Sequence, residues 1–185
     1  MNKKWQMGIM LLVIAVLLVA FLLLRDHNQK QKEKENNNES EETIEVISGD
    51  MDAVTALVYP QAGENISLLK VDGVWKAKED QEKALDQSKI NMMLVELVPF
   101  LAKREITDVR DYAQYGLDDA QKVIITMGEK TYRILVGDLN ELTGDYYVKL
   151  DDSNVVYIVE SKRILATAYS LQDLIVEDKT EDETD

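Results

Sequence analysis

An unbroken apolar run from Met7 to Leu24 constrains this chain more than any other feature. Its residues include no charged side chain and no proline, and the run is long enough to cross a bilayer core as a helix. A cleaved signal peptide would have a shorter apolar region ending in small residues, whereas this run ends in Phe21 and leucines. A buried helix of a soluble domain would carry polar positions, which are missing here. We therefore expect residues 1–25 to be a retained transmembrane anchor that binds the lipid bilayer.

The charges on the two sides of the run leave its orientation nearly tied. Lys3 and Lys4 precede it, whereas Arg25, Lys30, Lys32 and Lys34 follow it. Basic residues favour the cytoplasmic side, and the pair before the run lies nearer to the lipid than most of those after it. We expect a single-pass protein of the cell membrane with a cytoplasmic N-terminus and its domain outside.

The rest of the chain divides by composition into three parts. Residues 26–42 contain no apolar side chain, so they cannot bury enough surface to offset the entropy of ordering. We expect a disordered polar linker over residues 26–43. Residues 44–176 have the usual size of one domain, and the charge run over residues 177–185 predicts an acidic disordered tail.

The pattern within residues 44–176 predicts an α+β domain, in which an antiparallel sheet rich in hairpins and meanders packs on one main helix and a C-terminal helix. Asp72-Gly73 separates two strand-like runs and predicts a hairpin in which Lys70 opposes Trp75. Trp75 then shares a face with apolar neighbours, which favours a core position over an exposed binding role. The strand before this hairpin is expected to stop at Pro60.

The main helix is expected to begin at Asp86 or Ser88 and to kink or end early near Val98, because Pro99 lies inside the pattern. Its apolar residues recur at helical spacing on one buried face: Ile90, Leu94, Leu97 and Leu101. Met92 and Met93 are interpreted as core-filling side chains, although a methionine stripe can also line a peptide groove.

Residues 111–118 predict a helical turn that ends at Gly116 in the left-handed conformation, with Leu117 folding back. An antiparallel meander of short strands follows over residues 122–160, with Gly137 and Asp138 in one of its loops. Ser161 is expected to cap a last helix whose buried face comprises Ile164, Ala168, Leu171 and Ile175.

In this order, these pieces resemble the family described as domain of unknown function 4340. The residues that carry the resemblance lie between Val54 and Glu160 and include Trp75, Tyr115, Gly116, Leu117, Asp118, Gly137 and Asp138. One departure is Asp119-Ala120, where such proteins more often have a proline. The resemblance implies a bacterial envelope protein, anchored by its N-terminal helix and exposed outside the membrane, and some such proteins are encoded beside ABC-type export systems. It supplies no catalytic residue, so these residues are treated as a structural motif.

The composition excludes several chemistries. The chain has no cysteine and one histidine, His27, so zinc sites of Cys and His and nucleophiles activated by histidine in a triad are ruled out. No glycine-rich phosphate loop occurs. Asp138, Asn140 and Asp145 only superficially suggest a calcium loop, because the glycine is misplaced and the terminal Glu is missing. The net charge of -14 opposes nucleic acid as a partner. We expect no cofactor and no metal.

Two functions of different classes remain open. The first is a non-enzymatic interaction module that binds an integral-membrane or envelope protein, with an accessory role in an ABC-type transport system. The second is a carboxylate-based envelope hydrolase or glycan-processing enzyme, which needs a cleft holding two acids about 5 to 10 Å apart. A sensor is disfavoured because so few residues precede the anchor. The lack of a catalytic constellation favours the first function, so we do not expect an enzyme.

Overall fold

The structure is a computed structural model that describes residues 43–176. The predicted anchor over residues 1–25, the linker up to residue 42 and the tail over residues 177–185 lie outside the described residues. Within the described range, no helix combines the length and the apolar character needed to cross a bilayer.

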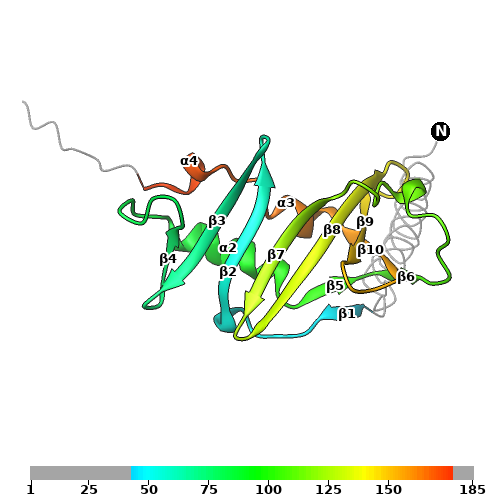
Figure 1. The fold of residues 1–185 in the computed structure, drawn as a ribbon, viewed down its shortest axis with the longest axis horizontal. Coiled ribbons are helices and arrows are strands. Elements are labelled where there is room, and N and C mark those ends of the chain that lie inside the picture. The colour runs from blue at the N-terminus through cyan, green and yellow to red at the C-terminus, as the bar shows by residue number, and fades with distance from the viewer. Residues whose placement is uncertain (1–42, 177–185) are drawn as a thin grey trace, which may run out of the picture. The chain divides into compact units, whose positions relative to one another are not determined.

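Strands dominate the secondary structure. In chain order the elements are β1 (Ile44–Ile47), η1 (Met51–Ala53), β2 (Val54–Gln61), β3 (Glu64–Val71), β4 (Val74–Ala77), α2 (Gln87–Leu97), β5 (Phe100–Ala102), β6 (Arg104–Ile106), η2 (Ala113–Tyr115), β7 (Gln121–Met127), β8 (Lys130–Asn140), β9 (Asp145–Leu150), β10 (Val156–Glu160), α3 (Ser161–Leu165) and α4 (Leu171–Leu174). Eight strands form one sheet in the order β4-β3-β2-β7-β8-β9-β10-β6, while β1 pairs with β5 (Figure 1). All pairs are antiparallel, which confirms the α+β prediction.

The main hydrophobic core lies between one face of the large sheet and the helices α2 and α3 (Figure 1). Side chains alternate between the two faces of a strand, so every second residue of the central strands enters this core. The largest side chains that it buries completely are Trp75, Tyr59 and Phe100. Burial of an aromatic side chain of this size stabilises the fold by about 1.5 to 3 kcal/mol.

The hairpin of β3 and β4 forms as the sequence predicts. Lys70 pairs with Trp75, and the two turn residues have positive φ angles, 49° at Asp72 and 81° at Gly73. Trp75 is 2% exposed, which confirms its core position. The Lys70 amine lies 6.0 Å from the centroid of the Trp75 ring.

The expected stop of the preceding strand at Pro60 is wrong. Strand β2 continues to Gln61, and Pro60 pairs with Asn65 of β3. The ladder between β2 and β7 ends at Val58, so the β7 side of the strand is unpaired at Pro60. Proline is tolerated in such an edge position because it removes no ladder hydrogen bond.

Helix α2 confirms the predicted main helix. Asp86 is its N-cap, and the carboxylate accepts hydrogen bonds from the backbone N–H groups of Ser88 and Lys89 at 3.0 and 3.1 Å. Such a cap stabilises a helix by about 1 kcal/mol. The helix ends at Leu97, and its buried residues are Ile90, Met93, Leu94 and Leu97.

Two details of the helix prediction are wrong. Leu101 belongs to strand β5 rather than to the buried helical face, because the helix ends before Pro99. Met92 is 57% exposed, whereas Met93 is buried. The buried residues Ile90, Met93, Leu94 and Leu97 cluster on one side of the helix, and at about 100° per residue Met92 points away from that side.

A single C-terminal helix is also not observed. The segment forms two short helices, and Ser161 is the first residue of α3 rather than its cap. Ser170 begins α4 through a capping box with Asp173, in which each side chain bonds the other's backbone. A capping box starts a new helix, so the longer helix is interrupted before it. Ala168, expected on the buried face, is exposed.

The meander of β7, β8, β9 and β10 confirms the predicted succession of strands, with one correction. Gly137 and Asp138 lie within β8 and not in a loop after it. The pairing of β8 with β9 shifts register between Val136 and Leu139, so the strand continues through an irregularity at these residues.

Candidate functional site

The turn at Tyr115 and Gly116 lies directly against Gly137 and Asp138 of β8. A Cβ atom at Gly137 would be 2.1 Å from the Tyr115 carbonyl oxygen, and one at Gly116 would be 2.4 Å from the Asp138 carboxyl group. Gly116 also has a φ of 67°, which disfavours any other residue. The structure thus brings the two segments together through glycines whose missing side chains allow the close approach.

This turn covers a second, smaller core. Leu117 is 3% exposed and packs with Leu135 and Val156. The rings of Tyr115 and Tyr147 lie above them, with centroids 5.0 Å apart. Leu117 therefore folds back as predicted, and the arrangement is that of a packed loop.

The seven predicted motif residues do not form one site. Asp118 is exposed, and Trp75 lies in the main core on β4. The backbone of Trp75 is instead bound by Gln87, whose side chain accepts from the Trp75 N–H at 2.8 Å and donates to its carbonyl at 3.1 Å. These contacts give Trp75 a structural role, at the edge of the large sheet.

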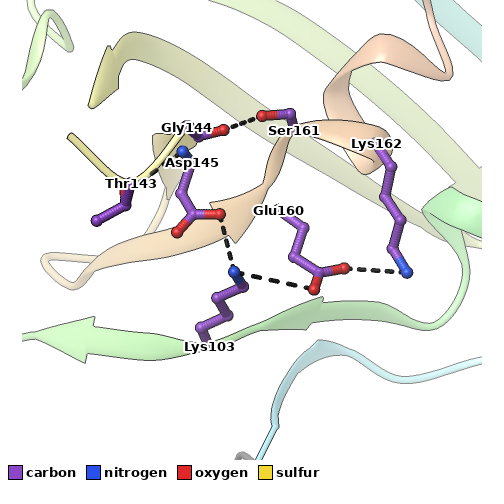
Figure 2. Close-up of polar contacts among 7 residues, drawn as sticks. All are labelled: Lys103, Thr143, Gly144, Asp145, Glu160, Ser161 and Lys162. Atoms are coloured by element: carbon purple, nitrogen blue, oxygen red, sulfur yellow. Dashed lines mark hydrogen bonds and ion pairs between the residues drawn. The ribbon is translucent and has the colours of Figure 1, made fainter. Parts of the chain in front are cut away.

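A group of charged residues joins β9, β10 and α3 to Lys103, which lies between β5 and β6 (Figure 2). The Lys103 amine lies 3.0 Å from a carboxylate oxygen of Asp145 and 3.9 Å from one of Glu160. Glu160 also pairs with Lys162 at 3.0 Å. Asp145 is 7% exposed, so its charge needs a cation close by. Beside it, the Ser161 hydroxyl donates to the Gly144 carbonyl (Figure 2).

The residues that superficially suggest a calcium loop have separate protein contacts. Asp145 pairs with Lys103, the Asn140 amide donates to the Tyr147 hydroxyl at 2.9 Å, and Asp138 lies against Gly116. Among residues 43–176, no group of three or more acidic or histidine side chains could hold a metal ion.

An apolar groove runs between α2 and the segment formed by α3 and the residues after it. Its volume is about 540 Å³. Met92 and Val95 of α2 are each 57% exposed, and Leu165 of α3 is 56% exposed. Apolar side chains that are exposed next to one another are typical of a surface that binds another molecule. Polar groups are few in the groove, and they include Glu96 on α2 and Lys162 on α3.

Arg163 fixes the two walls of this groove to each other. Its guanidinium donates to the carbonyl of Glu96 at 2.7 Å and to that of Pro99 at 3.2 Å. These are carbonyl groups at and just after the C-terminal end of α2, where a cation is favoured by the unpaired carbonyls and the helix dipole. The contact places the start of α3 beside the end of α2.

The segment after α3 is held to the large sheet by β2. The hydroxyl of Tyr59 donates to the carbonyl of Tyr169 at 2.9 Å, and the Gln61 amide donates to the carbonyl of Ala168. Burial raises the pKa of Tyr59 well above its usual value of about 10, and the nearby Asp173 adds to this effect. Tyr169 lines the groove, so these bonds help to fix the position of its wall.

The capping box beyond the groove carries the second shifted group. The pKa of the Asp173 carboxyl is lowered, first by the hydrogen bond from the Ser170 hydroxyl and then by the one from its backbone N–H. The Lys89 amine lowers the pKa further and donates to the Asp173 carbonyl at 2.6 Å. Asp173 is therefore a helix cap, and its hydrogen bonds account for the shift.

A second hollow lies between the start of β8 and the turn that follows β9, and its volume is about 250 Å³. It is lined by Thr131, Tyr132, Arg133, Leu150, Asp151 and Asp152. Two of these residues are acids, but Asp151 pairs with Lys122 at 3.5 Å in an exposed ion pair. The hollow thus provides polar groups on a solvated turn rather than a desolvated pair of carboxylates.

The sequence indicated part of the groove but not its function. By residue type the sequence singles out Met92 and predicts a core position for it, and Val95 and Leu165 are not among the predicted site residues. Met92 and Val95 are three residues apart, which places them together on the side of α2 opposite its buried face. That spacing was available in the sequence, but the position of α3 opposite this face was not.

Comparison with known proteins identifies a family for the chain. The family model described as Domain of unknown function (DUF4340) matches residues 28–180. Neither a curated protein nor a solved structure matches the chain.

Proposed function

We propose that this chain, which belongs to the DUF4340 family of unknown function, is a membrane-anchored interaction module without enzymatic activity. In this proposal Met7–Leu24 spans the cell membrane once, the N-terminus is cytoplasmic and the domain faces outward. The module binds a protein of the envelope as an accessory of an assembly such as an ABC-type transport system. The observation that carries the proposal is the apolar groove between α2 and α3.

The groove supports protein binding because of what it leaves in contact with water. Met92, Val95 and Leu165 are each more than half exposed along the two helical walls. A partner that removed these side chains from water would gain about 1 kcal/mol from each. Grooves between helices, especially those with methionine, accept apolar side chains of another helix because methionine adapts its shape.

The enzymatic alternative has weaker support. It requires two acids in a concave site, and one hollow among the described residues contains two acids, Asp151 and Asp152. The two acids are adjacent in sequence on a turn, and Lys122 neutralises one of them. Catalytic acids are usually set apart by the burial of one of them, whereas Asp151 and Asp152 are both exposed.

A photo-crosslinking residue at Val95 in the full-length chain tests the proposal in native membranes. We expect ultraviolet light to produce a covalent adduct with a protein, and we expect the chain to stay in the membrane during carbonate extraction. The same residue at Leu142, which is 96% exposed on the hairpin of β8 and β9, is the matched control. If Val95 gives no more protein adduct than Leu142, the groove is not a binding surface and the proposal is wrong.

A further inference from the structure

We propose that the groove binds the same groove of a second copy of this chain, so that the protein is a two-fold symmetric dimer. This inference rests on the proposed function, because it names the partner of the same surface. It follows from the position of two charges in the groove and from the apolar side chains between them.

Glu96 and Lys162 lie on different walls at the same end of the groove. Glu96 is on α2 and Lys162 is on α3, and Arg163, the neighbour of Lys162, bonds the Glu96 carbonyl at 2.7 Å. Within residues 43–176, no cation pairs with the Glu96 carboxylate. The Lys162 side chain is 58% exposed and pairs with Glu160 of the same chain at 3.0 Å, an exposed ion pair that contributes little to stability and leaves the lysine able to pair with a second acid. Each wall therefore presents one charge of opposite sign at this end.

A surface with this arrangement is complementary to itself. In a dimer with a two-fold axis, the same patch of both copies is in contact, and each contact occurs twice. If the axis runs along the groove, α2 of one copy faces α3 of the other. Glu96 then lies opposite Lys162 of the second copy, and Val95 lies opposite the second Leu165. An axis across the groove would instead bring opposite ends together and leave the charges unmatched.

The overall charge favours contact at this face over contact elsewhere. The chain has a net charge of -14, so two copies repel each other wherever acidic residues predominate. In the groove, Glu96 and Lys162 balance each other and the remaining surface is mostly apolar. At physiological salt, charges more than about 8 Å away are largely screened, so this local balance decides the contact.

Attachment to one membrane would make a weak contact effective. Two copies held at the same surface meet at a much higher effective concentration than two copies in solution. The modest apolar area of the groove can then support a dimer that would dissociate after removal from the membrane.

The sequence offers a clean test, because the full-length chain has no cysteine. Two differently tagged copies are produced in the same membranes, one with Val95→Cys and the other with Leu165→Cys, and are treated with a mild oxidant. We expect a disulfide between the two tags, in greater yield than either variant forms with itself. The control replaces Leu165→Cys by Leu142→Cys, which is more exposed but lies outside the groove.

Charge reversal tests the orientation of the dimer. Glu96→Lys alone or Lys162→Glu alone should lower the yield of the disulfide by about fivefold, because each reversal affects two symmetric pairs. The two reversals together should restore it. A merely structural effect would not be rescued by the second substitution.

The outcomes separate this inference from the proposed function. A disulfide between the tags that depends on the charges supports the dimer. If the cysteines form no disulfide between copies while Val95 still crosslinks to another protein, the second copy is the wrong partner and the interaction module stands. If neither experiment gives a product, both are wrong.

Discussion

The side-chain amide of Gln87 forms two hydrogen bonds with the backbone of Trp75, at 2.8 Å to its N–H and 3.1 Å to its carbonyl. The same amide also donates to the Leu85 carbonyl at 2.9 Å. Gln87 is the first residue of α2, and Trp75 lies in β4 at the edge of the large sheet. The Gln87 side chain thus satisfies backbone groups of an edge strand that could otherwise pair with a strand of another chain.

Gln87→Ala should lower the free energy of unfolding by about 1 to 3 kcal/mol, because it leaves partly buried backbone groups of Trp75 unpaired. Denaturation of the full-length chain in detergent, followed by circular dichroism, measures the change. Gln172→Ala, an exposed residue of α4, is the control and should change the midpoint by much less. Equal effects of the two substitutions would show that the bonds to Trp75 contribute nothing specific.

Gly137→Ala should destabilise the protein by about 2 to 3 kcal/mol, because its Cβ atom would lie 2.1 Å from the Tyr115 carbonyl oxygen. The turn over the second core should loosen, which hydrogen exchange at Leu117 reports. Gly128→Ala is the comparison, because a Cβ there meets nothing within 4 Å and only its φ of 56° is strained. That variant should lose about 1 kcal/mol. A Gly137→Ala protein as stable as wild type would contradict the packing described.

Lys103→Met should destabilise the protein by about 2 kcal/mol, since it leaves the buried Asp145 carboxylate without its nearest cation while Lys103 itself is 30% exposed. Adding Asp145→Asn should recover part of the loss, because no buried charge then remains. Lys122→Met removes the exposed pair with Asp151 and should change stability by less than about 0.5 kcal/mol. Chemical denaturation of all four proteins gives the comparison.

Tyr59→Phe should lower stability near neutral pH by about 1 kcal/mol through loss of the hydrogen bond to the Tyr169 carbonyl. Burial raises the pKa of Tyr59, so the folded protein holds this proton after the unfolded chain has lost it. The stability that depends on it is complete below about pH 10 and falls as the pH rises above that value. The variant should therefore lose less stability than wild type between about pH 10 and 11. Unfolding measured across this range checks the sign, and parallel curves for the two proteins would contradict it.

Much of the fold was predictable because it depends on neighbours in the sequence. Asp72-Gly73 set the register of a hairpin, and the capping residue Asp86 and the spacing of Ile90 and Leu94 set a helix. Gly116 and Leu117 likewise have the conformations expected of them.

The errors have two origins: some depend on a segment distant in the chain, and others depend on which side of a helix faces the core. Pro60 lies within β2 because the pairing of β2 with β7 ends at Val58, before the proline. Met92 is exposed because it lies on the side of α2 that points away from the core. The contact of Gln87 with Trp75 depends on where the helix meets the sheet. The groove requires α3 to lie beside α2, and this position cannot be predicted from the sequence. Only Met92, one of its residues, stands out there by residue type.

The pairing of β2 with β7 has a consequence for how the chain is made. Strand β2 ends at Gln61 and β7 begins at Gln121, so the ribosome must produce the intervening residues before this seam can close. Until then the backbone groups of β2 that pair with β7 in the folded domain have no partner strand. Contacts of such long sequence separation form late and slow folding, and unpaired edges favour aggregation. The edge of β2 that β7 covers in the folded domain therefore stays exposed until the second half of the domain has been made.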